Sequence, residues 1–195
     1  MMGEKITYHP PVLVIVTGIP GSGKTTLSLG LFESYGTKVA GGVLDRIQAV
    51  YVDKDMINDG FTNERSGDLY TMVREGTYKA IDSIARKNLE LGNSVWIDAT
   101  YSTEVGTPEW VDRYREIAER TGSKLKLIRC VASEKAIRPR LERRGYQRDE
   151  RKLENWEAFL EAEPIRVDIS CHGIEINGES PLEQNIETVL KFLQE

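Results

Sequence analysis

Cysteine and histidine are scarce in this chain, which has two of each among its 195 residues. The cysteines, Cys130 and Cys171, form no C-x-x-C pair, so the sequence disfavours both a zinc ribbon and a disulfide framework. We expect two reduced thiols, as in a cytoplasmic protein. His9 and His172 have no neighbouring residues that would complete a metal site, and we assign them no role.

Long apolar runs and an excess of positive charge are also absent. No stretch approaches the ~18 apolar residues that a membrane-spanning helix requires. The net charge of -5 disfavours a general nucleic-acid coat or a membrane-surface binder. Apolar residues make up 39% of the chain, enough for a buried core. We therefore expect residues 1–195 to form a single domain, and we expect the protein to be cytoplasmic.

Strand-like and helix-like segments alternate along the chain, which predicts an α/β fold with a mostly parallel sheet. The segment 37–48 gives no firm prediction. We predict strands at 12–17, 49–52, 94–97 and 125–131, with one or two more within 166–176. We predict helices at 24–35, 68–91, 107–122, 133–144, 150–162 and 181–193, the last opened by a capping box at 180–183.

The most informative motif lies directly after the first predicted strand. Residues 18–25 match G-x-x-x-x-G-K-[ST], the phosphate-binding P-loop, and a predicted helix follows. Its glycines allow backbone N–H groups to point inward, where they and the helix N-terminus bind a polyphosphate. Lys24 supplies a charge for the outer phosphates, and Thr25 a hydroxyl for Mg²⁺. The predicted nucleotide-binding residues are Gly18, Pro20, Gly21, Ser22, Gly23, Lys24, Thr25 and Thr26.

Several classes of P-loop protein are disfavoured because their other sequence motifs are absent from the chain. The D-x-x-G and N-K-x-D motifs of GTPases and the L-S-G-G-Q segment of ABC proteins are absent, and the chain is short for most motor or AAA-type ATPases. A small kinase fits the length, and without a guanine-reading motif we expect ATP as the nucleotide. A nucleotide-binding regulator without transfer activity is the alternative from another class.

Two aspartates follow predicted strands at the edge of the sheet where ligands collect. Asp55, two residues after Asp53, follows the second strand, and Asp98 follows the third. A carboxylate at either place can accept a proton from an attacking hydroxyl or hold Mg²⁺ through water. Helix capping and turn formation are the ordinary alternatives for such aspartates. Beside a P-loop, we favour function for Asp55 and Asp98.

Arginines are concentrated in residues 138–152, around Gly145-Tyr146. The cluster is typical of an arginine-rich lid that closes over a transferring phosphate, because the guanidinium group binds phosphate oxygens bidentately. A solvated helix face is the alternative for most of these arginines. We favour function for Arg140 and Arg144. The members of the cluster are Arg138, Arg140, Arg143, Arg144, Arg148 and Arg151.

In its P-loop, its two aspartate segments and its arginine cluster, the chain resembles a group of small P-loop kinases. The group includes the kinase domain of phage T4 polynucleotide kinase and zeta-toxin-like, chloramphenicol-phosphotransferase-like and seryl-tRNA kinase-like proteins. The resemblance is carried by G-x-P-G-S-G-K-T-T at 18–26, D-K-D at 53–55, D-A-T at 98–100 and R-P-R-L-E-R-R-G at 138–145. It implies a three-layer sandwich around a five-stranded, mostly parallel sheet with an arginine-rich lid.

The resemblance also implies roles for individual residues. Asp55 would be the general base on the acceptor hydroxyl, Asp98 a second aspartate near the acceptor and Mg²⁺, and Arg144 a lid arginine that neutralises phosphate charge. Lys24 would act with them in catalysis, Thr25 with Asp98 at the metal, and Arg140 at the nucleotide. Polynucleotide kinases carry an arginine three residues after the base, where this chain has Asn58.

The expected activity is therefore ATP-dependent transfer of the γ-phosphate to a hydroxyl. The acceptor is a small molecule or the end of a nucleic acid. Asn58 and the acidic composition argue mildly against the polynucleotide and tRNA alternatives.

Overall fold

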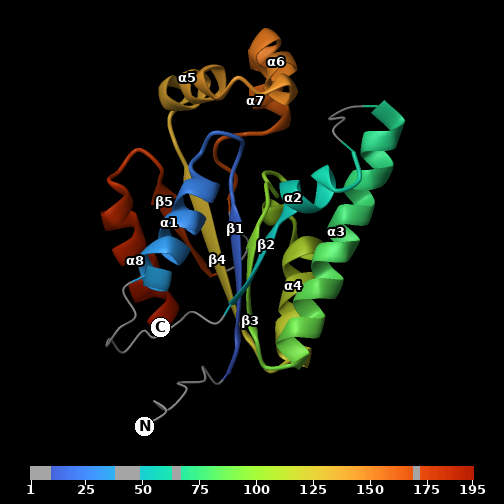
Figure 1. Ribbon diagram of the computed structural model, residues 1–195, viewed down its shortest axis with the longest axis vertical. Helices are drawn as coiled ribbons and strands as arrows, with labels where there is room; N and C mark the ends of the chain where they lie inside the picture. Colours follow the sequence, from blue (N-terminus) through green and yellow to red (C-terminus); the bar gives the residue numbers. More distant parts are fainter. Residues whose placement is uncertain (1–9, 38–48, 63–66, 169–171) are drawn as a thin grey trace.

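Five parallel strands form the centre of the computed structural model, in the order β2-β3-β1-β4-β5 (Figure 1). The structure describes residues 10–37, 49–62, 67–168 and 172–195. The strands are β1 (Val12–Thr17), β2 (Ala49–Asp53), β3 (Ser94–Asp98), β4 (Lys124–Val131) and β5 (Gly173–Asn177). The helices are α1 (Lys24–Thr37), α2 (Lys54–Asp59), α3 (Gly67–Glu90), α4 (Pro108–Arg120), α5 (Glu134–Arg144), α6 (Gln147–Glu154), α7 (Trp156–Ala162) and α8 (Leu182–Gln194).

Strand β1 shows how the sequence pattern produces the layers. Its apolar residues alternate between the two faces of the sheet, as the strand geometry requires. Leu13 and Ile15 pack in the cluster beneath α3 and α4, whereas Val14 and Val16 pack in the cluster beneath α1 and α8. Figure 1 shows these helix pairs on opposite sides of the sheet. The α/β three-layer architecture with a five-stranded sheet is thus confirmed, and every strand pairing is parallel.

Helices α5, α6 and α7 lie over the carboxyl ends of the strands (Figure 1). A third apolar cluster attaches them, in which Ile137 and Leu141 of α5 meet Trp156 and Phe159 of α7. Trp156 and Phe159 pack against each other, with ring centroids 5.3 Å apart. The same cluster includes Ile19 of the P-loop, so this layer packs directly on the phosphate-binding loop.

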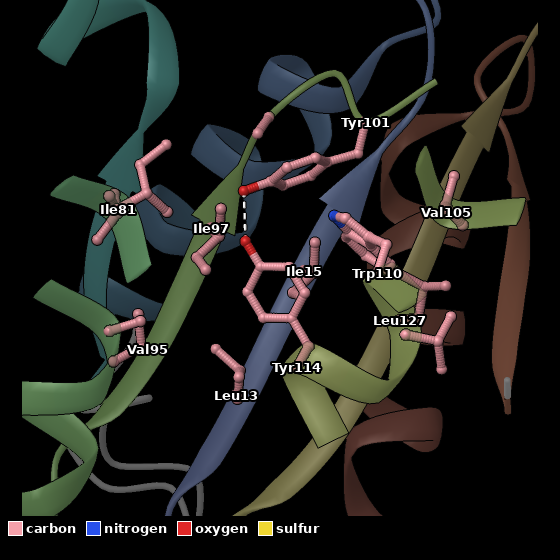
Figure 2. Close-up of a cluster of buried hydrophobic side chains, with 14 of the residues drawn as sticks. Leu13, Ile15, Ile81, Val95, Ile97, Tyr101, Val105, Trp110, Tyr114 and Leu127 are labelled. Carbon is pink, nitrogen blue, oxygen red and sulfur yellow. Dashed lines mark hydrogen bonds between the residues drawn. The ribbon is translucent and has the colours of Figure 1, made fainter. Parts of the chain in front are cut away.

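A buried hydrogen-bond network stabilises the face covered by α3 and α4. The hydroxyls of Tyr101 and Tyr114 lie 2.5 Å apart (Figure 2). Tyr114 also donates a hydrogen bond to Asp82 at 2.8 Å. Asp82 in turn pairs with Arg113. These contacts partner the two tyrosine hydroxyls of a largely apolar cluster, which would otherwise be costly to bury. Tyr101 and Tyr114 therefore belong to the core.

The structure corrects four details of the predicted elements. The helix predicted over 150–162 is two helices, because Asn155 has a non-helical backbone (φ -120°, ψ 57°) that turns Trp156 back onto α5. Helix α2 was not predicted, since it has only six residues. The capping box does not form: Pro181 is the N-cap of α8 without a side-chain bond. Among the described residues of 166–176, only the last four lie in a strand.

Cys130 is a free thiol, and burial raises its pKa to about 12, so it is protonated at neutral pH. Cys171, His9 and nearly all of the segment 37–48 lie outside the described residues. Within the described ranges, every helix is either too short or too polar to cross a lipid bilayer.

Candidate nucleotide and phosphate-transfer site

The loop between β1 and α1 has the conformation that its glycines predict. Gly18, Gly21 and Gly23 all have positive φ angles, which glycine adopts without strain. At Gly18 the packing is also tight, since a Cβ there would lie 2.2 Å from the carbonyl oxygen of Cys130. The loop therefore requires glycine for both backbone angle and space, and it leads into the N-terminus of α1 as a phosphate-binding loop does.

Lys24, Thr25 and Asp98 come together at the start of α1. Lys24 Nζ donates to the carbonyl oxygen of Ile19 at 3.3 Å, within its own loop. Asp98 is 4% exposed and accepts hydrogen bonds from Thr25 and from the Tyr51 hydroxyl, the latter at 3.1 Å. Burial raises the pKa of Asp98 above its ordinary value, and the charge of Lys24 and these hydrogen bonds partly offset that effect.

Asp53 and Asp98 end neighbouring strands in register with one another. Asp53 acts as the N-cap of α2: its Oδ1 accepts from the backbone N–H groups of Asp55 and Met56 at 2.7 and 3.1 Å. This cap starts a short helix directly after the strand, which fixes the backbone that carries Asp55. Asp53 is thus the capping aspartate, and both Asp53 and Asp55 line the cleft described below.

Both oxygens of Asp55 contact cations. Oδ1 lies 3.1 Å from Lys54 Nζ, and Oδ2 lies 2.7 Å from an Nη of Arg148. Burial by itself raises the pKa of Asp55, but the charges of Lys54, Arg148 and Lys24 outweigh it, so the pKa lies below its ordinary value. Asp55 is therefore charged at neutral pH.

The arginines of α5 and α6 have different partners. Arg140 donates to the backbone carbonyls of Gly21 and Gly178, at 3.0 and 2.7 Å, and so links α5 to the P-loop and to the loop after β5. Arg144 binds the buried carboxylate of Asp149 at 2.7 and 2.5 Å. Of these arginines, Arg148 is the one that reaches the carboxylate of Asp55.

One cleft of about 1360 Å³ collects most of the predicted residues. Two of them do not line it: Gly18 is buried against the Cys130 carbonyl, and Ser22 is 1% exposed. Tyr146 is not a lining residue either; its ring lies 4.9 Å from the guanidinium carbons of Arg144 and Arg148. The predicted residues on the wall are Pro20, Gly21, Gly23, Lys24, Thr25, Thr26, Asp55, Asp98, Arg140 and Arg144.

The cleft also includes residues that sequence reasoning missed. Tyr70 and Arg74 come from α3, Gln147 from the start of α6, and Glu163 from the end of α7. Tyr70 and Arg74 are one helical turn apart, which was the available signal that they share a face. No local motif marks Glu163, whose pKa is raised by burial and lowered in part by Lys152.

Asn58, the residue that departs from the polynucleotide kinases, is fully buried and lies outside the cleft. It therefore presents no side chain to a substrate phosphate.

The residues at the P-loop fit a magnesium ion bound together with phosphates. The Thr25 hydroxyl and the Asp98 carboxylate are hydrogen-bonded oxygen ligands of the kind that Mg²⁺ prefers. In the described ranges, no three acidic, histidine or cysteine side chains are grouped so as to hold a metal alone. Mg²⁺ in such sites is usually coordinated by one or two protein oxygens, and phosphates and water complete its coordination shell.

The strand, glycine loop and helix, with the flanking layers, define a P-loop fold. The AAA_33 family model, described as an AAA domain, matches residues 13–164, and the chain belongs to this family. The short length therefore did not exclude an AAA description. Membership among the polynucleotide-kinase-like or zeta-toxin-like proteins remains a resemblance. No curated protein matches the chain.

Solved structures of kinases share this fold at low sequence identity. A protein from Chloroflexus aurantiacus, provisionally described as a kinase, has a TM-score of 0.70 and 18% identity, over 95% of this chain and 100% of that one. The Mycobacterium tuberculosis APS kinase, in complex with AMPPNP and APS, has a TM-score of 0.62 and 15% identity, over 95% and 99%. A gluconokinase from Sinorhizobium meliloti has a TM-score of 0.59 and 15% identity, over 96% and 94%.

Proposed function

We propose that the protein is a kinase that transfers the γ-phosphoryl group of ATP to a hydroxyl group of a small molecule. The observation that carries this proposal is one cleft lined by the P-loop, by Asp98 and by Asp55. A nucleotide regulator needs the P-loop but has no need of a second carboxylate facing the same space. The kinase fold of the similar structures supports the same conclusion.

The order of the strands supports one orientation of the substrates along the cleft. The P-loop follows the central strand, β1, while Asp98 and Asp55 follow β3 and β2 on one side of it. The γ-phosphate of a bound nucleotide would point towards these aspartates. Its base would lie on the other side, where the loop after β5 contributes Gly178 and Ser180 to the cleft. The acceptor would then lie between α2 and α3 and beneath α6.

In the reaction, each residue has a specific task. The P-loop N–H groups and Lys24 would bind the β- and γ-phosphates. Mg²⁺, held by the phosphates, Thr25 and Asp98, would supply positive charge to the transferring group. Asp55 would accept the proton of the acceptor hydroxyl as its oxygen forms a bond to phosphorus, and ADP would leave. Arginines of α5 and α6 would neutralise charge on the phosphoryl oxygens.

Arg74 supports an acceptor that also carries an anionic group. Its Nη2 binds Glu104 at 3.1 Å, and its guanidinium carbon lies 4.9 Å from the ring centroid of Tyr78, so the side chain is held in place on the cleft wall. A guanidinium has five donors, so donors remain for a carboxylate, sulfate or phosphate. The similar APS kinase and gluconokinase are named for such acidic acceptors.

A transfer assay with γ-labelled ATP tests the proposal. The protein is incubated with small-molecule and RNA fractions of a cell extract, and Lys24→Ala serves as the control without nucleotide binding. Label in the small-molecule fraction is expected. Label confined to RNA would identify a nucleic-acid kinase, and no label with ATP still bound would favour a regulator.

Matched pairs of an acidic and a neutral acceptor, such as gluconate and glucose, test whether Arg74 binds an anionic group of the acceptor. Arg74→Met should raise KM for the acid by about tenfold or more, because a hydrogen bond to a charged group is lost. KM for the neutral partner should not change. Arg86→Met, an exposed change on the same helix outside the cleft, is the control. An equal effect of Arg74→Met on both members of the pair would contradict the assignment.

A further inference from the structure

The contact between Arg148 and Asp55 joins two parts of the molecule that are distant in sequence. Asp55 lies at the start of α2, whereas Arg148 lies on α6, directly after the hinge-like turn at Gly145 with φ 63°. The pair is partly exposed, with side-chain exposures of 41% for Asp55 and 20% for Arg148. Both residues line the cleft, so their contact spans the space that the substrates would occupy.

In this arrangement Asp55 is not ready to act as a base. One oxygen is bonded to Lys54 and the other to Arg148, and these charges lower the pKa of Asp55 and so make it a weaker base towards an acceptor hydroxyl. Lys54 is adjacent in the chain and nearly buried, and it stays with Asp55. Arg148 is the partner whose departure would free an oxygen of Asp55 and strengthen it as a base.

The neighbouring arginines show why Arg148 is the one that moves. Arg144 is bound by Asp149, which is 1% exposed, and separating that pair would leave the buried carboxylate with Lys152 as its remaining cationic partner. Arg140 is bound to two backbone carbonyls. Arg148 makes one ion pair, and the partner carboxylate is 41% exposed, so water can solvate that carboxylate when the pair separates. A γ-phosphate carries more charge than a carboxylate and can accept two parallel bonds from the guanidinium.

We propose that Arg148 exchanges between Asp55 and the γ-phosphate of the bound nucleotide, so that ATP binding, but not ADP binding, uncovers the base. The inference rests on the proposed function of Asp55. It makes Asp55 and the γ-phosphate competitors for one guanidinium group. The base is then covered when the cleft is empty or holds product, and uncovered when a phosphoryl group is present to transfer.

Calorimetric titration with the magnesium complexes of AMPPNP and ADP tests this competition in four proteins: wild type, Asp55→Asn, Arg148→Met and the double variant. Asp55→Asn should tighten AMPPNP binding by about two- to fivefold, the range of partly exposed ion pairs, and leave ADP binding unchanged. Arg148→Met should weaken AMPPNP binding by about tenfold, with a smaller effect on ADP. In the Arg148→Met background, Asp55→Asn should no longer tighten AMPPNP binding.

The double variant separates the exchange from simple repulsion between Asp55 and phosphate. If Asp55→Asn tightens AMPPNP binding equally with and without Arg148, repulsion explains the effect and the exchange is wrong. An unchanged affinity in Asp55→Asn overturns it as well. Arg138→Met removes a charge from α5 outside the cleft and should leave both affinities unchanged. Thermal melting verifies that each variant is folded. Transfer at the wild-type rate by Asp55→Asn would refute the proposed base, whatever the affinities.

Discussion

Replacement of Asp149 by asparagine tests how much the buried ion pairs of Asp149 with Arg144 and Lys152 contribute to the free energy of unfolding. Asp149 is 1% exposed, and it binds Arg144 at 2.7 and 2.5 Å and Lys152 at 2.9 Å. Removal of one partner from a fully buried ion pair costs about 3–5 kcal/mol. Arg144 and Lys152 are 28% and 23% exposed and can recover some hydration, so the expected loss is about 2–4 kcal/mol.

Chemical denaturation measures this loss, and thermal melting should show a fall of about 4–16 °C for a protein of this size. Asp112→Asn is the matched control, because Asp112 is exposed and pairs with Arg115 at the surface; it should cost less than about 1 kcal/mol. A loss below about 1 kcal/mol for Asp149→Asn would refute the reasoning, since Asp149 would then not hold Arg144 and Lys152 at the cleft.

Two further predictions concern the cleft. Gly178→Ala should weaken AMPPNP binding by about tenfold in a titration. The added Cβ would lie 2.0 Å from the backbone oxygen of Ser22 in the P-loop, and such overpacking costs about 1–3 kcal/mol. Gly76→Ala is the control: it has open space around it and should leave AMPPNP binding unchanged. Because cations hold the pKa of Asp55 below its ordinary value, the acid limb of kcat/KM should lie at lower pH than an ordinary aspartate would give. Arg148→Met should shift that limb to higher pH; a shift to lower pH or none would contradict the base assignment.

The parts of the fold that the sequence predicted are those determined by local pattern. The run of apolar residues in β1 and the glycine motif after it specify a buried strand and a phosphate-binding loop without knowledge of the rest of the chain. Ser133 and Gly145 bound α5 as predicted, because a side-chain cap and a left-handed residue act within a few residues. The break at Asn155 could not be predicted, because it depends on the packing of Trp156 against α5.

The residues of the candidate site also fall into two groups, those that local sequence pattern predicted and those that it did not. The P-loop residues, Asp55 and Asp98 were found because they follow predicted strands whose carboxyl ends must meet at one edge of the sheet. Arg74 and Glu163 were missed, because tertiary packing alone brings α3 and the end of α7 to the cleft. Among the arginines, sequence reasoning favoured Arg144 over Arg148; only the structure gives Arg144 a buried partner and brings Arg148 to Asp55. The catalytic roles stay predictions.

The most direct test of the account is the rate of phosphoryl transfer in a single turnover by Asp55→Asn, with nucleotide saturating and an acceptor identified from the labelled fraction. Asparagine keeps the shape of the side chain but cannot take the proton. The account predicts a rate lower by about 10²–10⁴-fold while the nucleotide still binds. Transfer at the wild-type rate would contradict the claim that Asp55 is the base of a kinase.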